Sequence, residues 1–512
     1  MIIALLACTP AEDLDDSRPA DSEAWVMDAR YDRLGVALEE ERLRLGAPGL
    51  GVAVWQDGQL VWSSGLGSRH PERDEAFTGS TLFRIGSVTK MLTATALLQQ
   101  MQAGLADPET LLADLVEVET ISPDEYTKLS LHQLLSHQSG FYDHTPLEGS
   151  SKDEKLASYT HGTWARSFSW QMVEPGAFWN YSNPNFALAG LATELLDGRF
   201  YRQILSEDVF TPLGMDRTLF LPEEVLADGD YALGDAYDWT GETSDRRVAD
   251  ADSYDNAWSR PAGFAWASPE ELARFGGFLL EGEPEVLDAE HLGLLTEPHV
   301  RFQYAAEEVD GRYGYGVMSL LGLETSEGWV AEPVYWHNGA IPGYSADLYA
   351  FPDRGVAVAI LGNTDGAYVS TDALLDGLSD AIGFPAAEPM PEPAIAEDLS
   401  VYAGSYYDRY NIGSVSIAYD QGRLLIECPT LENYGYVCGD ELVPYDEDLF
   451  LLDLSGQWIA VSLLAGPDHE SQYLRHRAFV AHRVETEARA LAPRPHLERL
   501  LSAPPPRPQP RR

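Results

Sequence analysis

The hydrophobic residues of 22–384 follow strand spacing at the two ends of this stretch and helical spacing between them. Near its start, Gly51–Trp55 and Gln59–Trp62 flank the pair Asp57-Gly58, which is typical of a tight hairpin turn. Helices are predicted over 21–45, 88–103, 131–136, 186–196 and 269–280, and strands over 334–336, 346–350 and 356–361. The apolar positions of the first helix are Trp25, Met27, Leu34, Val36, Leu38 and Leu43. This order predicts an α+β domain in which helices flank an antiparallel sheet.

Beyond residue 384 the chain changes character. Residues 385–397 are rich in proline and predict a stiff linker. After it the hydrophobic positions alternate with a period of two over 415–419, 424–426, 449–454, 458–464 and 473–482. Short strands at this spacing predict a small antiparallel β-barrel over 398–485, with a β-sandwich as the alternative. The Pro- and Arg-rich residues 486–512 predict a disordered tail.

The composition excludes one large class of partner. The 512 residues carry 82 acidic and 34 basic side chains, which gives a formal net charge of −48. A nucleic-acid binder needs a basic face to neutralise phosphates, so we expect no nucleic-acid partner. Hydrophobic residues make up 45% of the chain and aromatic residues 11%, which argues against disorder and for a large core. We therefore expect a soluble, acidic, multidomain protein.

The N-terminus and the cysteines bear on localisation. Residues 1–21 are predicted to be a lipoprotein signal and linker, because Leu5–Cys8 resembles a lipobox whose cysteine would carry a lipid. The apolar stretch Ile2–Ala7 is shorter than a usual signal core, so a short apolar terminus without function is the alternative. Cys428 and Cys438 could pair in an oxidising compartment. We expect an exported periplasmic or outer-membrane lipoprotein, touching the membrane only through that lipid, with a cytoplasmic protein as the alternative. Thiol titration of the denatured protein that finds both C-terminal cysteines free would count against export.

The pair Ser87 and Lys90 carries the first candidate chemistry. Residues three apart share a helix face, so the Lys90 amine can reach the Ser87 hydroxyl at the start of the helix predicted over 88–103. A desolvated lysine can take the proton of a serine nucleophile, and the helix N-terminus favours a developing oxyanion. The pair alone also fits an N-terminal serine followed by an exposed lysine.

Two further segments add to this pair. Tyr181 and Asn183 follow a Pro-Gly turn, and a tyrosine between a serine–lysine pair and an asparagine can relay protons. His337, Gly339 and Ala340 lie on a predicted strand that runs into a loop, where a backbone N–H can stabilise an oxyanion. Taken singly, the tyrosine also fits a pocket wall and the histidine a strand residue.

With these three motifs in this order, the chain resembles the serine β-lactamase/penicillin-binding-protein superfamily over about residues 30–380. It is most similar to the class C β-lactamase-like branch, which includes D-aminopeptidases, D-Ala-D-Ala carboxypeptidases and esterases. Three collinear segments also resemble landmarks of this branch: Leu134–Gly140, Pro212–Thr218 and Ala262–Phe275. The chain departs from the pattern at Gln138, Phe264 and Glu271.

The resemblance assigns roles to the first two motifs. It implies that Ser87 is a nucleophile that forms an acyl-enzyme and that Lys90 and Tyr181 share general base and acid work. Asn183 would hold the lysine and the substrate amide. The implied function is a serine hydrolase without a cofactor or metal, acting on an amide or ester, most readily a small D-amino-acid peptide or a small ester.

The third motif bears on the substrate. His337 stands where penicillin-recognising relatives carry lysine, and Gly339 completes the His-x-Gly motif. The backbone N–H groups of Ser87 and Ala340 would form the oxyanion hole. A histidine is mostly neutral at pH 7, whereas a lysine charge suits a substrate carboxylate, so β-lactam hydrolysis ranks lower. The alternatives are a β-lactamase and a non-catalytic penicillin-recognising sensor.

The other candidates are weaker. No serine has glycine both two positions before and two after it, as the nucleophile elbow of α/β-hydrolases requires, and no H-E-x-x-H zinc motif occurs. The segment Leu399–Tyr407 resembles the opening of the lipocalin-like barrel that follows the catalytic domain in several relatives. Such a barrel would line the active site or help assemble oligomers, and the sequence leaves the oligomeric state open.

Overall fold

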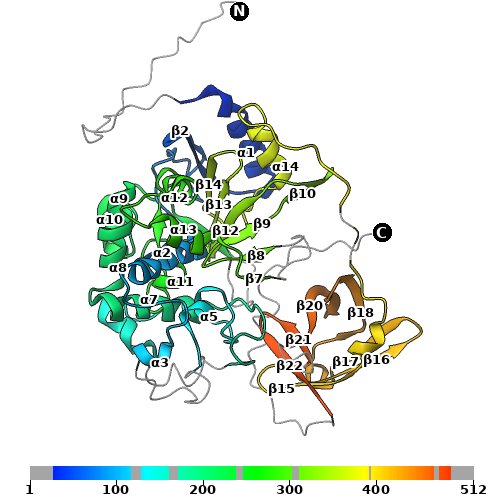
Figure 1. Cartoon of the computed structure of the whole chain (residues 1–512). Coiled ribbons are helices and arrows are strands. Elements are labelled where there is room, and N and C mark those ends of the chain that lie inside the picture. Colours follow the sequence, from blue (N-terminus) through cyan, green and yellow to red (C-terminus); the bar gives the residue numbers. More distant parts are fainter. Residues whose placement is uncertain are drawn as a thin grey trace, which may run out of the picture.

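The structure is a computed structural model that describes residues 27–116, 128–160, 171–237, 246–302, 311–390, 392, 394–465 and 472–485 (Figure 1). Cys8, the predicted signal and the predicted tail 486–512 lie outside these residues. None of the helices in the described ranges is long and apolar enough to span a membrane.

An eight-stranded sheet forms the centre of the first domain, in the order β2-β1-β14-β13-β12-β9-β8-β7. Its strands are β1 (Gly49–Gln56), β2 (Gln59–Gly67), β7 (Val300–Arg301), β8 (Arg312–Tyr313), β9 (Met318–Leu320), β12 (Val334–Ile341), β13 (Tyr344–Phe351) and β14 (Val356–Gly362). All neighbouring strands are antiparallel, which confirms the predicted sheet. Strands from both ends of the domain meet in the middle, because Val52 of β1 pairs with Ile360 of β14. The β1–β2 turn is the expected one, with Asp57 and Gly58 both at positive φ.

One face of the sheet is covered by α1 (Asp32–Leu45) and α14 (Thr371–Leu378) (Figure 1). Leu34 and Leu38, four residues apart, are buried and face the sheet. Of the other apolar positions of this helix, Val36 and Leu43 are 62% and 63% exposed. They lie on the other side of the helix because their spacing from Leu34 and Leu38 does not follow three or four residues.

The other face packs against the helical half of the domain through α12 (Pro269–Glu281). The remaining α-helices in the described part of this domain are α2 (Thr89–Gln102), α3 (Leu112–Leu115), α5 (Leu131–Leu135), α7 (Asn183–Asp197), α8 (Tyr201–Ile204), α9 (Thr211–Leu213), α10 (Pro222–Asp228), α11 (Arg260–Gly263) and α13 (Ala289–Thr296). Three short pairs complete the domain: β3 (Phe83–Arg84) with β6 (Trp266–Ala267), β4 (Gly234–Tyr237) with β5 (Arg246–Ala249), and β10 (Leu323–Thr325) with β11 (Gly328–Val330). Helix α2 is buried along nearly its whole length, and such a helix can carry a side chain in a dry site.

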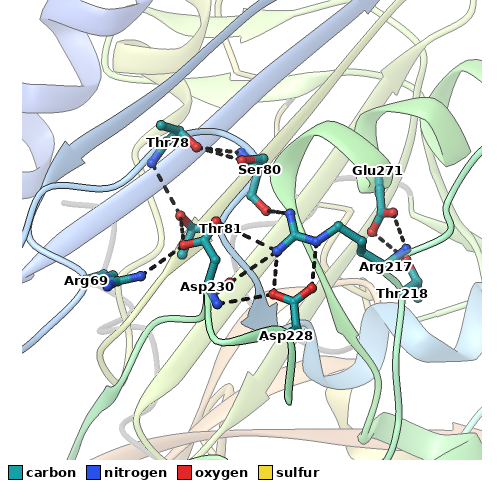
Figure 2. Close-up of polar contacts among 9 residues, drawn as sticks. All are labelled: Arg69, Thr78, Ser80, Thr81, Arg217, Thr218, Asp228, Asp230 and Glu271. Carbon is teal, nitrogen blue, oxygen red and sulfur yellow. Dashed lines mark hydrogen bonds and ion pairs between the residues drawn. The ribbon is translucent and has the colours of Figure 1, made fainter. Parts of the chain in front are cut away.

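Two of the landmark segments meet at the first turn of α12 (Figure 2). Glu271 accepts a hydrogen bond from the backbone N–H of Arg217 (2.6 Å) and one from the hydroxyl of Thr218 (3.0 Å). The Arg217 guanidinium pairs with Asp228 (2.6 Å) and donates to the carbonyl oxygen of Ser80 (2.7 Å). Burial raises the pKa of Glu271 to about 7. None of the nine residues drawn in Figure 2 is a candidate site residue, so these landmarks brace the fold.

The C-terminal residues form a closed barrel, which confirms the predicted small antiparallel barrel over the alternative sandwich. Its strands are β15 (Gly404–Asp408), β16 (Gly413–Asp420), β17 (Arg423–Glu427), β18 (Cys438–Asp446), β19 (Leu449–Leu454), β20 (Gln457–Ala465), β21 (Gln472–His476) and β22 (Phe479–Val484). Cys428 and Cys438 form a disulfide that closes a loop containing α15 (Pro429–Asn433). The residues 473–482, predicted as one strand, form two strands joined by a turn at Arg477-Ala478, so that prediction is wrong.

Candidate active site

Ser87 lies at the start of the central helix. It is the middle residue of a single 3-10 turn, Gly86–Val88, that leads directly into α2. The serine is half-buried, whereas Lys90, one turn further along, is fully buried. The sequence therefore places a half-buried hydroxyl at the positive end of a helix and a buried amine one turn further along.

The Lys90 amine is held by three acceptors. Its Nζ donates to Ser87 Oγ (2.9 Å), to Asn183 Oδ1 (2.6 Å) and to the carbonyl oxygen of Ala262 (2.6 Å). Burial lowers the pKa of Lys90 well below its usual value, an effect that the cation of Arg477 reinforces and the carboxylate of Asp143 opposes. A lowered pKa increases the share of neutral amine at neutral pH, which is the form able to accept the serine proton.

Tyr181 lies beside this amine. The Lys90 Nζ is 4.9 Å from the centroid of the Tyr181 ring, and the ring is 5% exposed. The segment turns into α7 at Asn183, and Pro184 in the first turn favours a helix start there. His137, at a positive φ of 56°, also contacts this segment: its Nδ1 accepts a hydrogen bond from the backbone N–H of Ser182 (3.2 Å).

The third motif contacts the serine turn through two glycines. A methyl group added to Gly86 would lie 2.5 Å from the backbone nitrogen of Ala340, and one added to Gly339 would lie 3.0 Å from the backbone nitrogen of Ser87. Gly86 also has a positive φ of 51°, which glycine adopts without strain. The two glycines therefore allow the backbone of β12 at Ala340 and the turn that carries Ser87 to approach closely.

His337 is fully buried on β12. Its Nδ1 lies 2.6 Å from the carbonyl oxygen of Asn338, and since a carbonyl only accepts, Nδ1 carries the proton. The Nε2 then accepts from the hydroxyl of Tyr313 (3.2 Å). Burial first, and the charge of Lys90 second, lower the pKa of His337 to about 3. The side chain is therefore a neutral hydrogen-bonding group at neutral pH.

This pKa gives a testable pH dependence. The unfolded chain protonates His337 near pH 6.5 and the folded chain only near pH 3, so this group's contribution to stability is present above pH 6.5 and is lost as the pH falls towards 3. In NMR spectra of protein with ¹³C-labelled histidine, the signal that disappears in His337→Gln should keep the shift of a neutral imidazole from pH 8 to pH 5. A midpoint for that signal near pH 6.5 would contradict the assignment.

The structure thus brings the seven candidate residues together: Ser87, Lys90, Tyr181, Asn183, His337, Gly339 and Ala340. Two charged neighbours were not predicted. Asp143 accepts from both the backbone and the side-chain nitrogen of Asn183 (2.8 and 3.0 Å), and Arg477 of the barrel pairs with that aspartate (2.5 Å). Asp143 comes three residues after the landmark Leu134–Gly140, but its residue type carries no signal of its own. No group of three or more His, Cys, Asp or Glu in the described ranges is arranged to hold a metal ion.

Comparison with known proteins places this geometry among relatives. The family described as Beta-lactamase matches residues 36–380. A D-aminopeptidase of Gluconobacter oxydans is 29% identical over 74% of this chain and 66% of its own length. Penicillin-binding protein 4 of Amycolatopsis lactamdurans is 27% identical over 76% of this chain and 98% of its own length.

A solved structure shares the fold of both domains. The crystal structure of SurE superposes with a TM-score of 0.65 at 24% sequence identity. The match covers 89% of this chain and 99% of that chain.

Proposed function

The chain belongs to the β-lactamase family, and on that premise we propose that it is a serine hydrolase that cleaves an amide or ester through an acyl-enzyme on Ser87. One observation carries the proposal. The buried amine of Lys90, with its lowered pKa, is hydrogen-bonded to the Ser87 hydroxyl at 2.9 Å. A poor nucleophile and a desolvated base within hydrogen-bonding distance are what acyl transfer by serine requires.

The steps follow from this geometry. Ser87 Oγ attacks the carbonyl carbon of the substrate, and its proton passes to the neutral amine of Lys90. The charge that develops on the carbonyl oxygen is stabilised by the N–H groups of Ser87 and Ala340. The C–N or C–O bond then breaks, and the leaving amine or alcohol takes a proton delivered by Lys90 and Tyr181. Water then gives a proton to the same pair as its oxygen attacks the acyl carbon. The bond between that carbon and Ser87 Oγ breaks, and Oγ takes the proton back from the pair, which releases the acid and restores the serine.

The substrate proposed is a small D-amino-acid peptide or amide, or a small ester. A neutral His337 offers no permanent charge to a carboxylate such as that of a β-lactam, because its pKa is about 3. The relative from Gluconobacter oxydans is named a D-aminopeptidase, which supports the peptide class. The active site therefore favours hydrogen-bonding and apolar contacts over ion pairing at this position.

A parallel assay tests the proposal. Initial rates are measured with D-alanyl p-nitroanilide, L-alanyl p-nitroanilide, p-nitrophenyl butyrate and a chromogenic cephalosporin at equal enzyme concentration. We expect turnover of the D-anilide or the ester, no faster turnover of the L-anilide, and little of the cephalosporin. A cephalosporin rate above the others would assign the chain to the β-lactamases, and binding of the cephalosporin without turnover of any substrate would assign it to the sensors.

A further inference from the structure

The barrel contacts the catalytic domain through its last hairpin, β21–β22, which in Figure 1 lies on the side of the barrel facing α5. The hairpin packs on the residues that precede Tyr181. Tyr473 and Val480 share an apolar cluster with Tyr142, Met172 and Val173. The His482 Nε2 lies 2.7 Å from the carbonyl oxygen of Met172 and therefore donates to it. The hairpin is thus anchored beside the segment that carries two candidate site residues.

The turn of this hairpin reaches the site itself. Arg477 donates from Nε to Asp143 Oδ2 (2.8 Å) and pairs with the same carboxylate through Nη2 (2.5 Å). Its guanidinium carbon lies 4.4 Å from the centroid of the Tyr181 ring. Arg475, 4% exposed, donates from Nε to Asn180 Oδ1 (2.9 Å). The barrel therefore places two arginines against the segment that ends in the catalytic tyrosine.

A continuous chain of hydrogen bonds leads from the barrel to Lys90. Asp143 Oδ1 accepts from the backbone N–H and from Nδ2 of Asn183, and Asn183 Oδ1 accepts from Lys90 Nζ. The carboxylate can only accept, so it fixes which end of the Asn183 amide faces the lysine. Arg477 in turn holds the other oxygen of that carboxylate.

We propose that Arg477 is a positioning residue for Lys90, acting through Asp143 and Asn183, so that the barrel is part of the active site. The inference rests on the proposed function, because it assigns a role in the same reaction. Arg477 need not touch the substrate: it keeps a carboxylate in place, the carboxylate orients an amide, and the amide holds the base.

The charges of Asp143 and Arg477 also affect the pKa of Lys90. Asp143 raises the pKa of Lys90 and Arg477 lowers it, so each charge offsets the other. Removing the arginine leaves the carboxylate uncompensated and raises the lysine pKa, which reduces the neutral amine at a given pH. The other titratable groups around Lys90 are His137 after α5, His337 on β12, Tyr181 before α7 and Tyr313 on β8. Both histidines have lowered pKa values and stay neutral at neutral pH.

The test compares pH profiles of kcat and kcat/KM for the full chain and four variants, on the best substrate of the assay above. Arg477→Met should lower kcat by roughly 10–100-fold, with a smaller change in KM, because the base is misplaced rather than the substrate. It should also move the acidic limb of kcat/KM to higher pH. Asp143→Asn should move that limb to lower pH, and the double variant should return it to near the wild-type position while kcat stays low. Arg477→Lys should recover part of kcat.

A matched control separates this role from a merely structural one. Arg301 on β7 forms another ion pair between the domains, with Glu447 of the barrel (2.6 Å), and the two side chains are 41% and 52% exposed. Arg301→Met should leave kcat and the pH profile as in the wild type. The inference is overturned if Arg477→Met leaves the limb unmoved, or if it behaves as Arg301→Met does. Activity that survives Ser87→Ala would instead overturn the proposed function, so the two failures are distinguishable.

Discussion

Ser87→Ala should reduce turnover of any amide or ester substrate by roughly four orders of magnitude or more, because no other group can form the acyl-enzyme. Lys90→Ala should cost about as much. The lysine is hydrogen-bonded to Ser87 and Asn183 from a fully buried position, and its loss removes the base from the serine. The double variant should be no worse than either single variant, since residues that act as one unit lose their effect together. Steady-state kinetics on purified, folded variants measures all three.

The chain offers matched controls for this prediction. Ser379 is exposed at the end of α14. Lys128, one of only four lysines, is also exposed. Ser379→Ala and Lys128→Ala should keep full activity. Losses that multiply in the Ser87/Lys90 double variant, instead of saturating, would mean that the two residues act separately.

Gly339→Ala should have the second largest effect. A methyl group there would lie 2.0 Å from the carbonyl oxygen of Ile85 and 3.0 Å from the nitrogen of Ser87. Both neighbours are backbone atoms, so β12 and the serine turn must move apart, which separates the two N–H donors of the oxyanion hole. Displacing one such donor costs roughly 10²–10³-fold in kcat. Kinetics at saturating substrate should show this loss mainly in kcat.

A second glycine serves as the control. Gly293 lies in α13 without a positive φ, and a methyl group there would meet no atom within 4 Å. Gly293→Ala should therefore keep activity and stabilise the fold slightly, since alanine restricts the unfolded chain. If Gly339→Ala keeps wild-type kcat, the N–H of Ala340 is not an oxyanion donor.

Local patterns in the sequence predict the helices and strands that carry the site residues, but not the tertiary contacts between those residues. The helix that begins after Ser87 follows from its long, largely apolar sequence, because a helix buried on all sides is apolar all round. The strand is predicted only over 334–336, whereas β12 continues to Ile341 and includes His337, Gly339 and Ala340. That Lys90 touches Asn183, 93 residues later in the chain, follows from no spacing. The contact between Lys90 and Asn183 was expected only from the resemblance to a family. In the structure the buried amine lies within hydrogen-bonding distance of three oxygen atoms, one of which belongs to Asn183.

The resemblance implies that the barrel lines the active site or helps assemble oligomers, but which barrel residues contact the site could not be predicted. The turn between β21 and β22 contains Arg477 and Ala478, with no glycine, proline or asparagine to mark it. The run therefore reads as one strand, and the arginine at its middle reads as a solvated strand residue. Only the tertiary contact with Asp143 gives it a place at the site, and that aspartate has no distinguishing pattern of its own.

The central claim is that Ser87 is a nucleophile activated by Lys90. The most direct measurement is reaction with a fluorophosphonate probe, followed by intact-protein and peptide mass spectrometry. The wild type should gain one adduct, with loss of fluoride, on the peptide that contains Ser87. Ser87→Ala should gain none, and Lys90→Ala should react far more slowly. An adduct on another residue, or labelling that persists in Ser87→Ala, would contradict the account.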